Sequence, residues 1–157
     1  MKKVYKLRDN SSIDYKKFDM NMTDFVNENG IKSPTDYLIV TSTKSKFTYI
    51  YERVLNYWSL IYKWSCTVGK PETPTIQGVF SSGEKYPAIQ EGEATAKYAL
   101  NIVEEFYYHS VIYNSDETYV TDDRLGVAVS HGCIRLATGN ARWIYDNVPT
   151  KTTIVIR

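Results

Sequence analysis

The chain has 157 residues, a formal net charge of +1, 43% hydrophobic residues and 24% charged residues. This length and composition are typical of one globular domain with its own core. The small net charge excludes strong electrostatic attraction to nucleic acid or to an anionic membrane surface, and no apolar run is long enough to cross a bilayer.

The first part of the chain, residues 1–36, is predicted to be an N-terminal appendage or linker that precedes a domain of residues 37–157. Met1 to Arg8 is basic, but no apolar stretch follows it, so it lacks the pattern of a signal peptide. A short helix is predicted from Thr23 to Asn29, because Thr23 can cap its start and Gly30 can end it.

Strands are predicted to begin at Tyr37. Residues 37–42 and 46–51 are rich in β-branched side chains, and the short polar segment between them suits a hairpin loop. A longer strand is predicted between Trp58 and Val68, where apolar and polar residues alternate. The predicted buried face of this strand consists of Trp58, Leu60, Tyr62, Trp64, Cys66 and Val68.

The second half of the chain is predicted to mix short strands with helices. Residues 94–104 have apolar side chains at helical spacing, which predicts a helix, and a second helix is predicted for Ala141 to Asn147, with Asn140 as its cap. Strands are predicted at residues 79–80, 106–113, 124–130 and 152–156. The expected fold class is therefore mostly β, a sandwich-like domain with two or three short helices.

The segment from Ser130 to Leu136, which reads SHGCIRL, carries the clearest chemical signal. A cysteine nucleophile needs a stabilised thiolate, a nearby base and donors for the oxyanion. Gly132 leaves room for an acyl group beside Cys133 and allows backbone N–H groups to converge. We therefore expect Cys133 to be an attacking thiolate, with a pKa lowered by a neighbouring imidazolium.

Two histidines are candidates for the base. His131 is two residues from Cys133 and shares the parity of Leu125, Val127 and Val129, so it is predicted to point into the core as an organising residue. His109 lies 24 residues before Cys133 on a separate predicted strand. Because a base usually reaches its nucleophile from a neighbouring strand, His109 is favoured.

A core thiol and a zinc site are the other interpretations of these residues. Cys66 follows the apolar face of Trp64, so it is predicted to be an unreactive core thiol rather than a disulfide partner of Cys133. A zinc site made of His109, His131 and Cys133 is the alternative for the histidines, but no carboxylate or second cysteine is placed as an obvious partner. No metal is therefore predicted.

The motif around Cys133 resembles the signature of the L,D-transpeptidase family. His109-Ser110 resembles the family's upstream histidine, and the hairpin of residues 37–51 resembles its first two strands. The segment GKPETPT at residues 69–75, followed by Gly78-Val79-Phe80, resembles its Gly-Lys-x-x-Thr-Pro-Thr loop. The resemblance covers roughly residues 37–157.

This resemblance implies a role for each matching residue. Cys133 matches the nucleophile and His109 the base, whose ring the backbone carbonyl of Ser110 would orient. Backbone N–H groups at Gly132 and Cys133 would hold the oxyanion, while His131 matches a motif position. Arg135 would either bind a substrate carboxylate or pair with a structural acid. An aromatic lid is expected within residues 81–105, with Tyr86 and Tyr98 as candidate substrate-binding residues.

The resemblance also implies the activity. Cys133 would attack the third residue of a peptidoglycan tetrapeptide stem, release D-Ala and pass the acyl group to a second stem as a 3→3 cross-link. Water as acceptor would make the enzyme an L,D-carboxypeptidase, and a protein amine would make it an anchoring transferase. A binding module without catalysis is a further alternative. We expect a monomer without a cofactor, outside the cytoplasm at a bacterial cell wall or surface, with donor and acceptor stems as partners.

Overall fold

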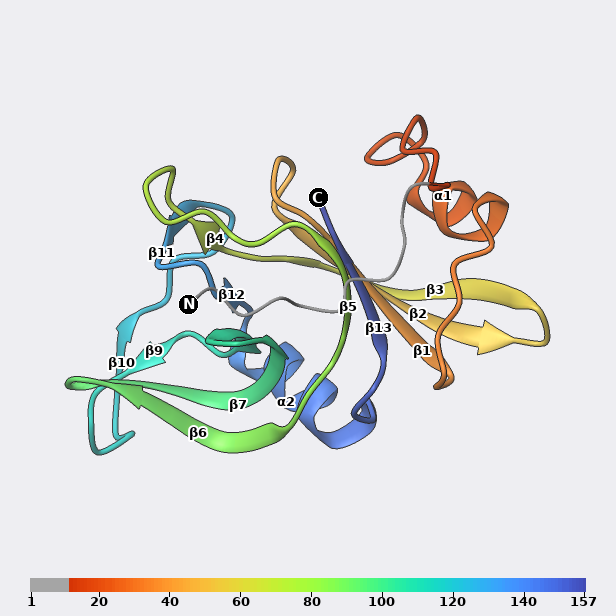
Figure 1. Ribbon diagram of the computed structural model, residues 1–157. Coiled ribbons are helices and arrows are strands. Elements are labelled where there is room, and N and C mark those ends of the chain that lie inside the picture. Colours follow the sequence, from red (N-terminus) through yellow and green to blue (C-terminus); the bar gives the residue numbers. More distant parts are fainter. Residues whose placement is uncertain (1–11) are drawn as a thin grey trace.

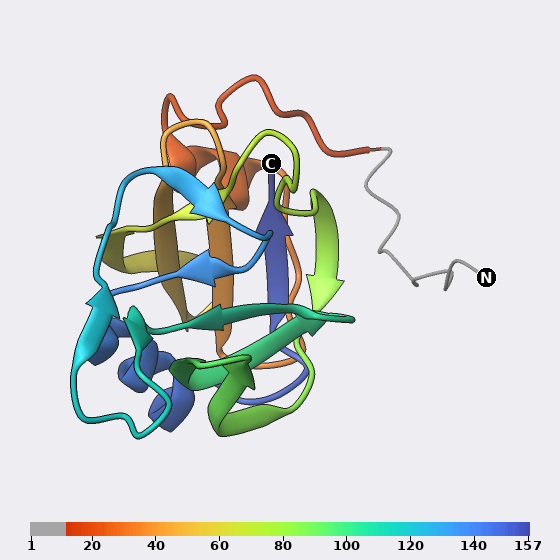
Figure 2. The ribbon, with the colours of Figure 1, turned by 90° about the vertical axis from the view of Figure 1, so that its left-hand side faces the viewer.

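The computed structural model describes residues 12–157, and the basic segment at Met1 to Arg8 lies outside these residues. The described chain is mostly β, as predicted, with two helices: α1 (Met22–Glu28) and α2 (Thr138–Asn147). Two main sheets pack against each other, and the strands of the second run across those of the first (Figures 1 and 2).

The first sheet has five strands in the order β3-β2-β1-β13-β5. Its central strands β1 and β13 pair in parallel, and the other neighbours are antiparallel. Nearly every residue of β1 and β13 is buried, because both faces of the sheet are covered. The strands are β1 (Tyr37–Ser42), β2 (Phe47–Val54), β3 (Tyr57–Ser65), β5 (Gly78–Ser81) and β13 (Thr153–Ile156).

The second sheet has the order β10-β9-β7-β8-β12, and β6 pairs with β7 to form a long hairpin. A separate two-stranded sheet joins β4 to β11. These strands are β4 (Val68–Gly69), β6 (Lys85–Glu91), β7 (Ala94–Val103), β8 (Phe106–His109), β9 (Ile112–Tyr113), β10 (Val120–Asp122), β11 (Ala128–Ser130) and β12 (Ile134–Arg135).

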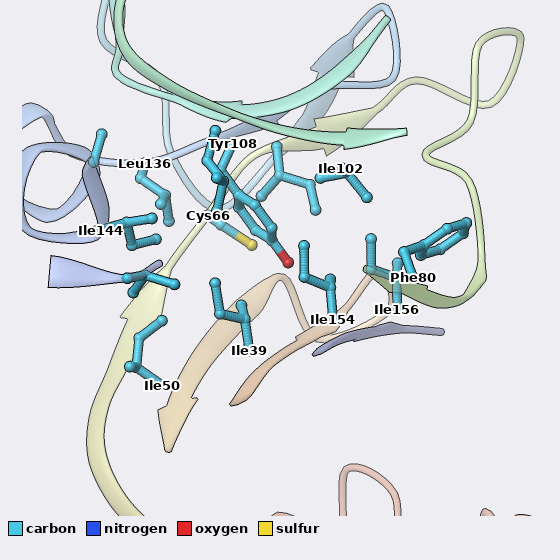
Figure 3. Close-up of a cluster of buried hydrophobic side chains, with 14 of the residues drawn as sticks. Ile39, Ile50, Cys66, Phe80, Ile102, Tyr108, Leu136, Ile144, Ile154 and Ile156 are labelled. Atoms are coloured by element: carbon cyan, nitrogen blue, oxygen red, sulfur yellow. The ribbon is translucent and has the colours of Figure 1, made fainter. Parts of the chain in front are cut away.

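The main core lies between the two sheets and is closed by α2, which packs against β7. Ile39 and Ile154 come from the first sheet and Tyr108 from the second, and Figure 3 shows them around Cys66. The Tyr108 hydroxyl, which is fully enclosed, shares a hydrogen bond of 2.8 Å with Thr41 Oγ1. Cys66 is 0% exposed, which confirms the prediction of a core thiol.

A second apolar cluster covers the outer face of the first sheet. Phe25 and Val26 of α1 are buried against Leu38 and Tyr51, so the described part of the predicted appendage is packed onto the domain. The helix is capped by Asn21, whose side chain accepts a hydrogen bond from the backbone N–H of Asp24. The predicted cap, Thr23, instead contacts the Tyr51 hydroxyl. Gly30 follows the helix with φ +57°, as its predicted role requires.

The helix predicted at residues 94–104 is wrong, because this segment is strand β7. Buried residues come in pairs there, at 95–96 and 99–100, which resembles a helical spacing. Tyr98, with φ +54°, makes the backbone irregular between these two pairs, although the pairing with β6 keeps one register across it. A kinked strand therefore imitates helical periodicity.

The single buried face predicted for residues 58–68 is also wrong. The pairing of β2 with β3 shifts register between Ile50 and Tyr51, so Ile61 is an extra residue on β3. Trp58 consequently packs in the outer cluster, whereas Trp64 packs against the main core. Leu60 remains 41% exposed.

Other boundaries also differ from the predictions, and the strand predicted at residues 106–113 is divided into β8 and β9. Only residues 128–130 of the strand predicted at 124–130 are extended, as β11. Helix α2 begins three residues earlier than predicted, at Thr138, and Ala137 occupies its cap position without a side-chain hydrogen bond. The predicted cap, Asn140, lies inside the first turn.

Candidate active site

The turn that carries Cys133 connects β11 to β12. Gly132 adopts φ +124°, and a Cβ atom there would lie 2.5 Å from Phe106 Cε1, so only glycine fits without displacing the ring. Ser130 closes the turn: its hydroxyl donates to the Cys133 carbonyl at 2.7 Å and accepts from the Gly132 N–H at 3.1 Å. The turn is therefore held rigidly, with Cys133 partly exposed.

The loop of residues 69–75 supports this turn from behind. The backbone N–H of Lys70 and the hydroxyl of Thr73 both donate to the Ser130 carbonyl at 3.0 Å. The Thr75 hydroxyl accepts from the Gly69 N–H at 2.9 Å and closes the loop on itself. The two sequence motifs that resemble the L,D-transpeptidase family are thus in direct contact.

His109 ends strand β8, which pairs in parallel with β12 so that His109 lies beside Arg135. Its Nδ1 forms a 2.7 Å hydrogen bond with the Ser110 carbonyl. Because a carbonyl only accepts, Nδ1 carries the proton and Nε2 is an acceptor. His109 is 5% exposed, and Nε2 has no hydrogen-bond partner among the described residues. Its catalytic role remains a prediction.

Two cavities of about 380 and 370 Å³ meet at Cys133 and His109. Both are also bordered by the end of the β6–β7 hairpin, at Glu91 and Ala94, and by Ile112. The first, here called the acidic cavity, adds Glu105 and Tyr107 to its walls. The second, here called the mixed cavity, adds Asp122, His131 and Arg135.

The electrostatics at the two central residues differ from the expected thiolate and imidazolium. Burial, helped by the charge of Arg135, lowers the pKa of His109 to about 4. Burial raises the pKa of the Cys133 thiol, and the charges of Glu91 and Glu105 act in the same direction against a backbone hydrogen bond from Tyr107. At neutral pH the pair is therefore a neutral thiol and a neutral imidazole. The lowered thiol pKa that we expected from the sequence is wrong for the protein without substrate.

The predicted oxyanion donors are not equivalent. The Gly132 N–H is directed to Ser130 Oγ, whereas the Cys133 N–H has no hydrogen-bond partner among residues 12–157. The Cys133 thiol itself lies 3.4 Å from the Glu105 carbonyl, as a donor to it. Only the Cys133 N–H is thus available to a developing oxyanion in this arrangement.

Arg135 is 5% exposed and lies in a wall of the mixed cavity. Its Nη1 is 3.1 Å from Asp122 Oδ1, and its buried Nε has no hydrogen-bond partner among the described residues. Asp122 also binds Arg124 through both carboxylate oxygens, and this lowers its pKa well below the usual range. Of the two roles considered for Arg135, pairing with a structural acid is therefore present.

The placement predicted for His131 is wrong. Its side chain is 68% exposed, and its Nδ1 lies 3.7 Å from Glu91 Oε1 at the end of the β6–β7 hairpin. The chain leaves β11 at Ser130 and turns sharply at Gly132, so strand parity does not extend to His131. Val127, whose parity was used in the prediction, is itself 37% exposed.

The two tyrosines proposed for substrate binding do not line either cavity. Tyr86 is 42% exposed and packs edge-to-face on Tyr107, and Tyr98 packs on Tyr145 and near Arg142 of α2. The β6–β7 hairpin, which lies within the region where a lid was expected, borders both cavities, and its role as a lid stays a prediction. Several wall residues were not predicted, among them Glu91, Glu105, Tyr107, Ile112 and Asp122. Only Tyr107, two residues before His109 on the same strand, had a usable signal.

No group of three or more potential metal ligands is found among residues 12–157, so His109, His131 and Cys133 do not form the zinc site considered above. Within the same range, neither helix is long and apolar enough to span a membrane.

Comparison with known proteins agrees with the fold and with the motifs. The YkuD family model, described as the L,D-transpeptidase catalytic domain, matches residues 36–156. A Bacillus subtilis (strain 168) protein, YciB, whose name assigns it provisionally as an L,D-transpeptidase, is 43% identical over 54 residues, which are 33% of this chain and 28% of that protein.

Solved structures resemble the domain over most of its length. A Clostridium acetobutylicum ATCC 824 protein, described as a fused Zn-dependent amidase/peptidase/peptidoglycan-binding domain-containing protein, has a TM-score of 0.74 at 36% identity, over 87% of this chain and 58% of that one. An L,D-transpeptidase from Mycobacterium smegmatis has a TM-score of 0.63 at 24% identity, over 78% and 58%. The chain thus spans less than two thirds of these relatives. The family match and the shared fold together show that this chain belongs to the L,D-transpeptidase catalytic-domain family.

Proposed function

We propose that the domain is a peptidoglycan L,D-transpeptidase that forms 3→3 cross-links through a thioester on Cys133. The observation that supports this most is that a partly exposed thiol, Cys133, and a buried imidazole, His109, border the same cavity. The Ser110 carbonyl holds that imidazole with Nε2 free to accept a proton.

In the proposed acylation, Sγ of Cys133 attacks the carbonyl carbon of the third stem residue while His109 Nε2 takes the thiol proton. The Cys133 N–H donates to the oxyanion. His109 then protonates the departing amine of D-Ala as the C–N bond breaks, which leaves a thioester. A pKa of about 4 keeps His109 neutral, and therefore able to accept the proton, at neutral pH.

The second half of the reaction requires a nucleophile that takes the acyl group. In the proposed function this is the side-chain amine of a second stem, whereas water would give an L,D-carboxypeptidase and a protein amine an anchoring transferase. Because peptidoglycan lies outside the cytoplasmic membrane, we propose that the domain acts extracytoplasmically, at the bacterial cell wall or surface. A non-catalytic binding module would not need an oriented imidazole in the wall of the cavity that the thiol borders.

Intact-mass measurement after incubation with a stem tetrapeptide tests this proposal. The protein should gain the mass of the donor minus D-Ala, and a second stem should convert the adduct to a cross-linked product. Cys133→Ala should form no adduct, while Cys66→Ala is the matched control, since it removes the buried thiol and should still acylate. An adduct of equal yield on Cys133→Ala would overturn the assignment of the nucleophile.

A further inference from the structure

The two cavities that meet at Cys133 differ in their charge. In the mixed cavity the carboxylate of Asp122 is paired with Arg124 and Arg135. Glu91 borders both cavities, and the acidic cavity adds Glu105 and has no lysine or arginine in its walls. Glu105 forms no ion pair with any residue in the described range. The acidic cavity therefore has two acidic residues and no lysine or arginine in its walls, whereas in the mixed cavity Arg135 offsets part of the negative charge.

Glu105 is close to the reacting sulfur. Its backbone carbonyl lies 3.4 Å from Cys133 Sγ, because the β7–β8 turn places it immediately before β8. The charges of Glu105 and Glu91 both raise the pKa of the Cys133 thiol, so their field extends to the sulfur atom. The same field would stabilise a positive group placed in this cavity.

The possible nucleophiles for deacylation differ in charge. At neutral pH a primary amine is mostly a cationic ammonium, whereas water is neutral. The ammonium must lose a proton before its nitrogen can attack. His109 is 5% exposed and borders the acidic cavity, and its Nε2 has no hydrogen-bond partner in the described range. The acidic cavity therefore attracts an ammonium group and also contains His109, which can transfer a proton of the attacking amine.

We propose that Glu105, together with Glu91, makes the acidic cavity the acceptor side and selects a primary ammonium over neutral nucleophiles. This inference rests on the proposed function. The bound ammonium releases one proton to solvent and becomes an amine, whose nitrogen attacks the thioester carbon. As the C–N bond forms and the C–S bond breaks, the second proton passes through His109 to Sγ. The products are an amide and the free Cys133 thiol.

The test starts from the preformed thioester and compares two acceptors in the same enzyme. One is a stem tetrapeptide with a free side-chain amine, and the other is hydroxylamine, which is uncharged at neutral pH. Glu105→Gln keeps the size of the side chain and the backbone contact to Sγ. Glu104→Gln is the matched control. It removes the same charge from the neighbouring residue, which lines neither cavity.

We expect Glu105→Gln to lower the ratio of stem-amine to hydroxylamine deacylation rates by about fivefold, the size of one partly solvated charge interaction. High salt should reduce the ratio in the unmodified enzyme and change it less in Glu105→Gln. Glu104→Gln should keep the original ratio. The inference would be overturned if the ratio of the two deacylation rates were the same in the unmodified enzyme and both variants, or if it fell equally in both variants. Neither result would contradict the formation of the thioester. Failure of the unmodified enzyme to form a thioester would overturn the proposed function itself.

Discussion

The outer cluster under α1 and the turn around Cys133 are built by different forces. Phe25 and Val26 are at most 1% exposed and bury apolar surface against the first sheet. The turn, by contrast, is held by hydrogen bonds among Ser130, Gly132 and Thr73. Burial supports the stability of the domain, whereas directional bonds support its geometry. Substitutions in the two regions should therefore affect stability and chemistry separately.

The largest effect is expected from His109→Gln. The rate of thioester formation should fall by about 10²- to 10⁴-fold, because the variant lacks a base for the thiol proton. A glutamine amide can still donate to the Ser110 carbonyl, so the melting temperature at neutral pH should change little. Time-resolved intact mass together with thermal melting measures both. Acylation near the original rate would exclude His109 as the base.

The His109→Gln variant also tests how the stability of the domain depends on pH. The pKa of His109 in the folded protein is about 4, below the unfolded value of about 6.5. Its neutral form is therefore favoured by folding. This contribution is fully present above about pH 6.5 and is lost as the pH falls toward 4. The unmodified protein should lose more unfolding free energy over this range than His109→Gln does. Denaturant titrations of both proteins at several pH values measure this difference. Equal losses of unfolding free energy in the two proteins would show that the imidazole is not buried as described.

Phe25→Ala should lower the stability of the domain and leave the rate of thioester formation unchanged. Removing a fully buried aromatic ring costs about 3–5 kcal/mol of unfolding free energy. The thioester should nevertheless form at the original rate at temperatures where the variant is folded, because α1 lies far from β11 and β12, the strands that flank Cys133 (Figure 1). Denaturant unfolding and acylation kinetics on one sample separate the two. A Phe25→Ala variant that acylates slowly but keeps its unfolding free energy would contradict the proposed separation of stability from chemistry.

A smaller effect is expected from Thr73→Val, which removes one hydrogen bond to the Ser130 carbonyl. Lys70 N–H still binds that carbonyl, so the cost should be about 1 kcal/mol, or roughly fivefold in the acylation rate if it acts on the turn. Thr73→Ser keeps the hydroxyl and is the control. If Ser and Val variants react equally fast, the hydroxyl does not support the turn.

The smallest effect is expected from His131→Ala. Since its side chain is 68% exposed, the substitution should change the unfolding free energy by less than about 0.5 kcal/mol. Its 3.7 Å pairing with Glu91 is also solvent-exposed and contributes little. A melting temperature several degrees lower would restore the buried role that strand parity suggested.

Much of the fold was predictable from local patterns. The hairpin of residues 37–51 and the mostly β class follow from β-branched runs with polar breaks, and the structure confirms them. The errors fall where the backbone departs from a regular period. Paired buried residues on either side of Tyr98, which has a positive φ, made a strand resemble a helix, and the extra residue in β3 divided one predicted face between two cores.

The sequence by itself determined the candidate catalytic residues, and it placed Cys133 where a strand enters a loop and His109 on a separate strand. These features depend on residue type and short spacing, since Gly132 and its neighbours shape their own turn. The tertiary structure alone decided that Glu91 and Glu105 border the thiol, that Arg135 binds Asp122 and that His131 faces solvent. Those facts depend on how the β6–β7 hairpin and the β7–β8 turn meet the β11–β12 connection. Residues distant in the chain then set the charge and burial on which each pKa depends.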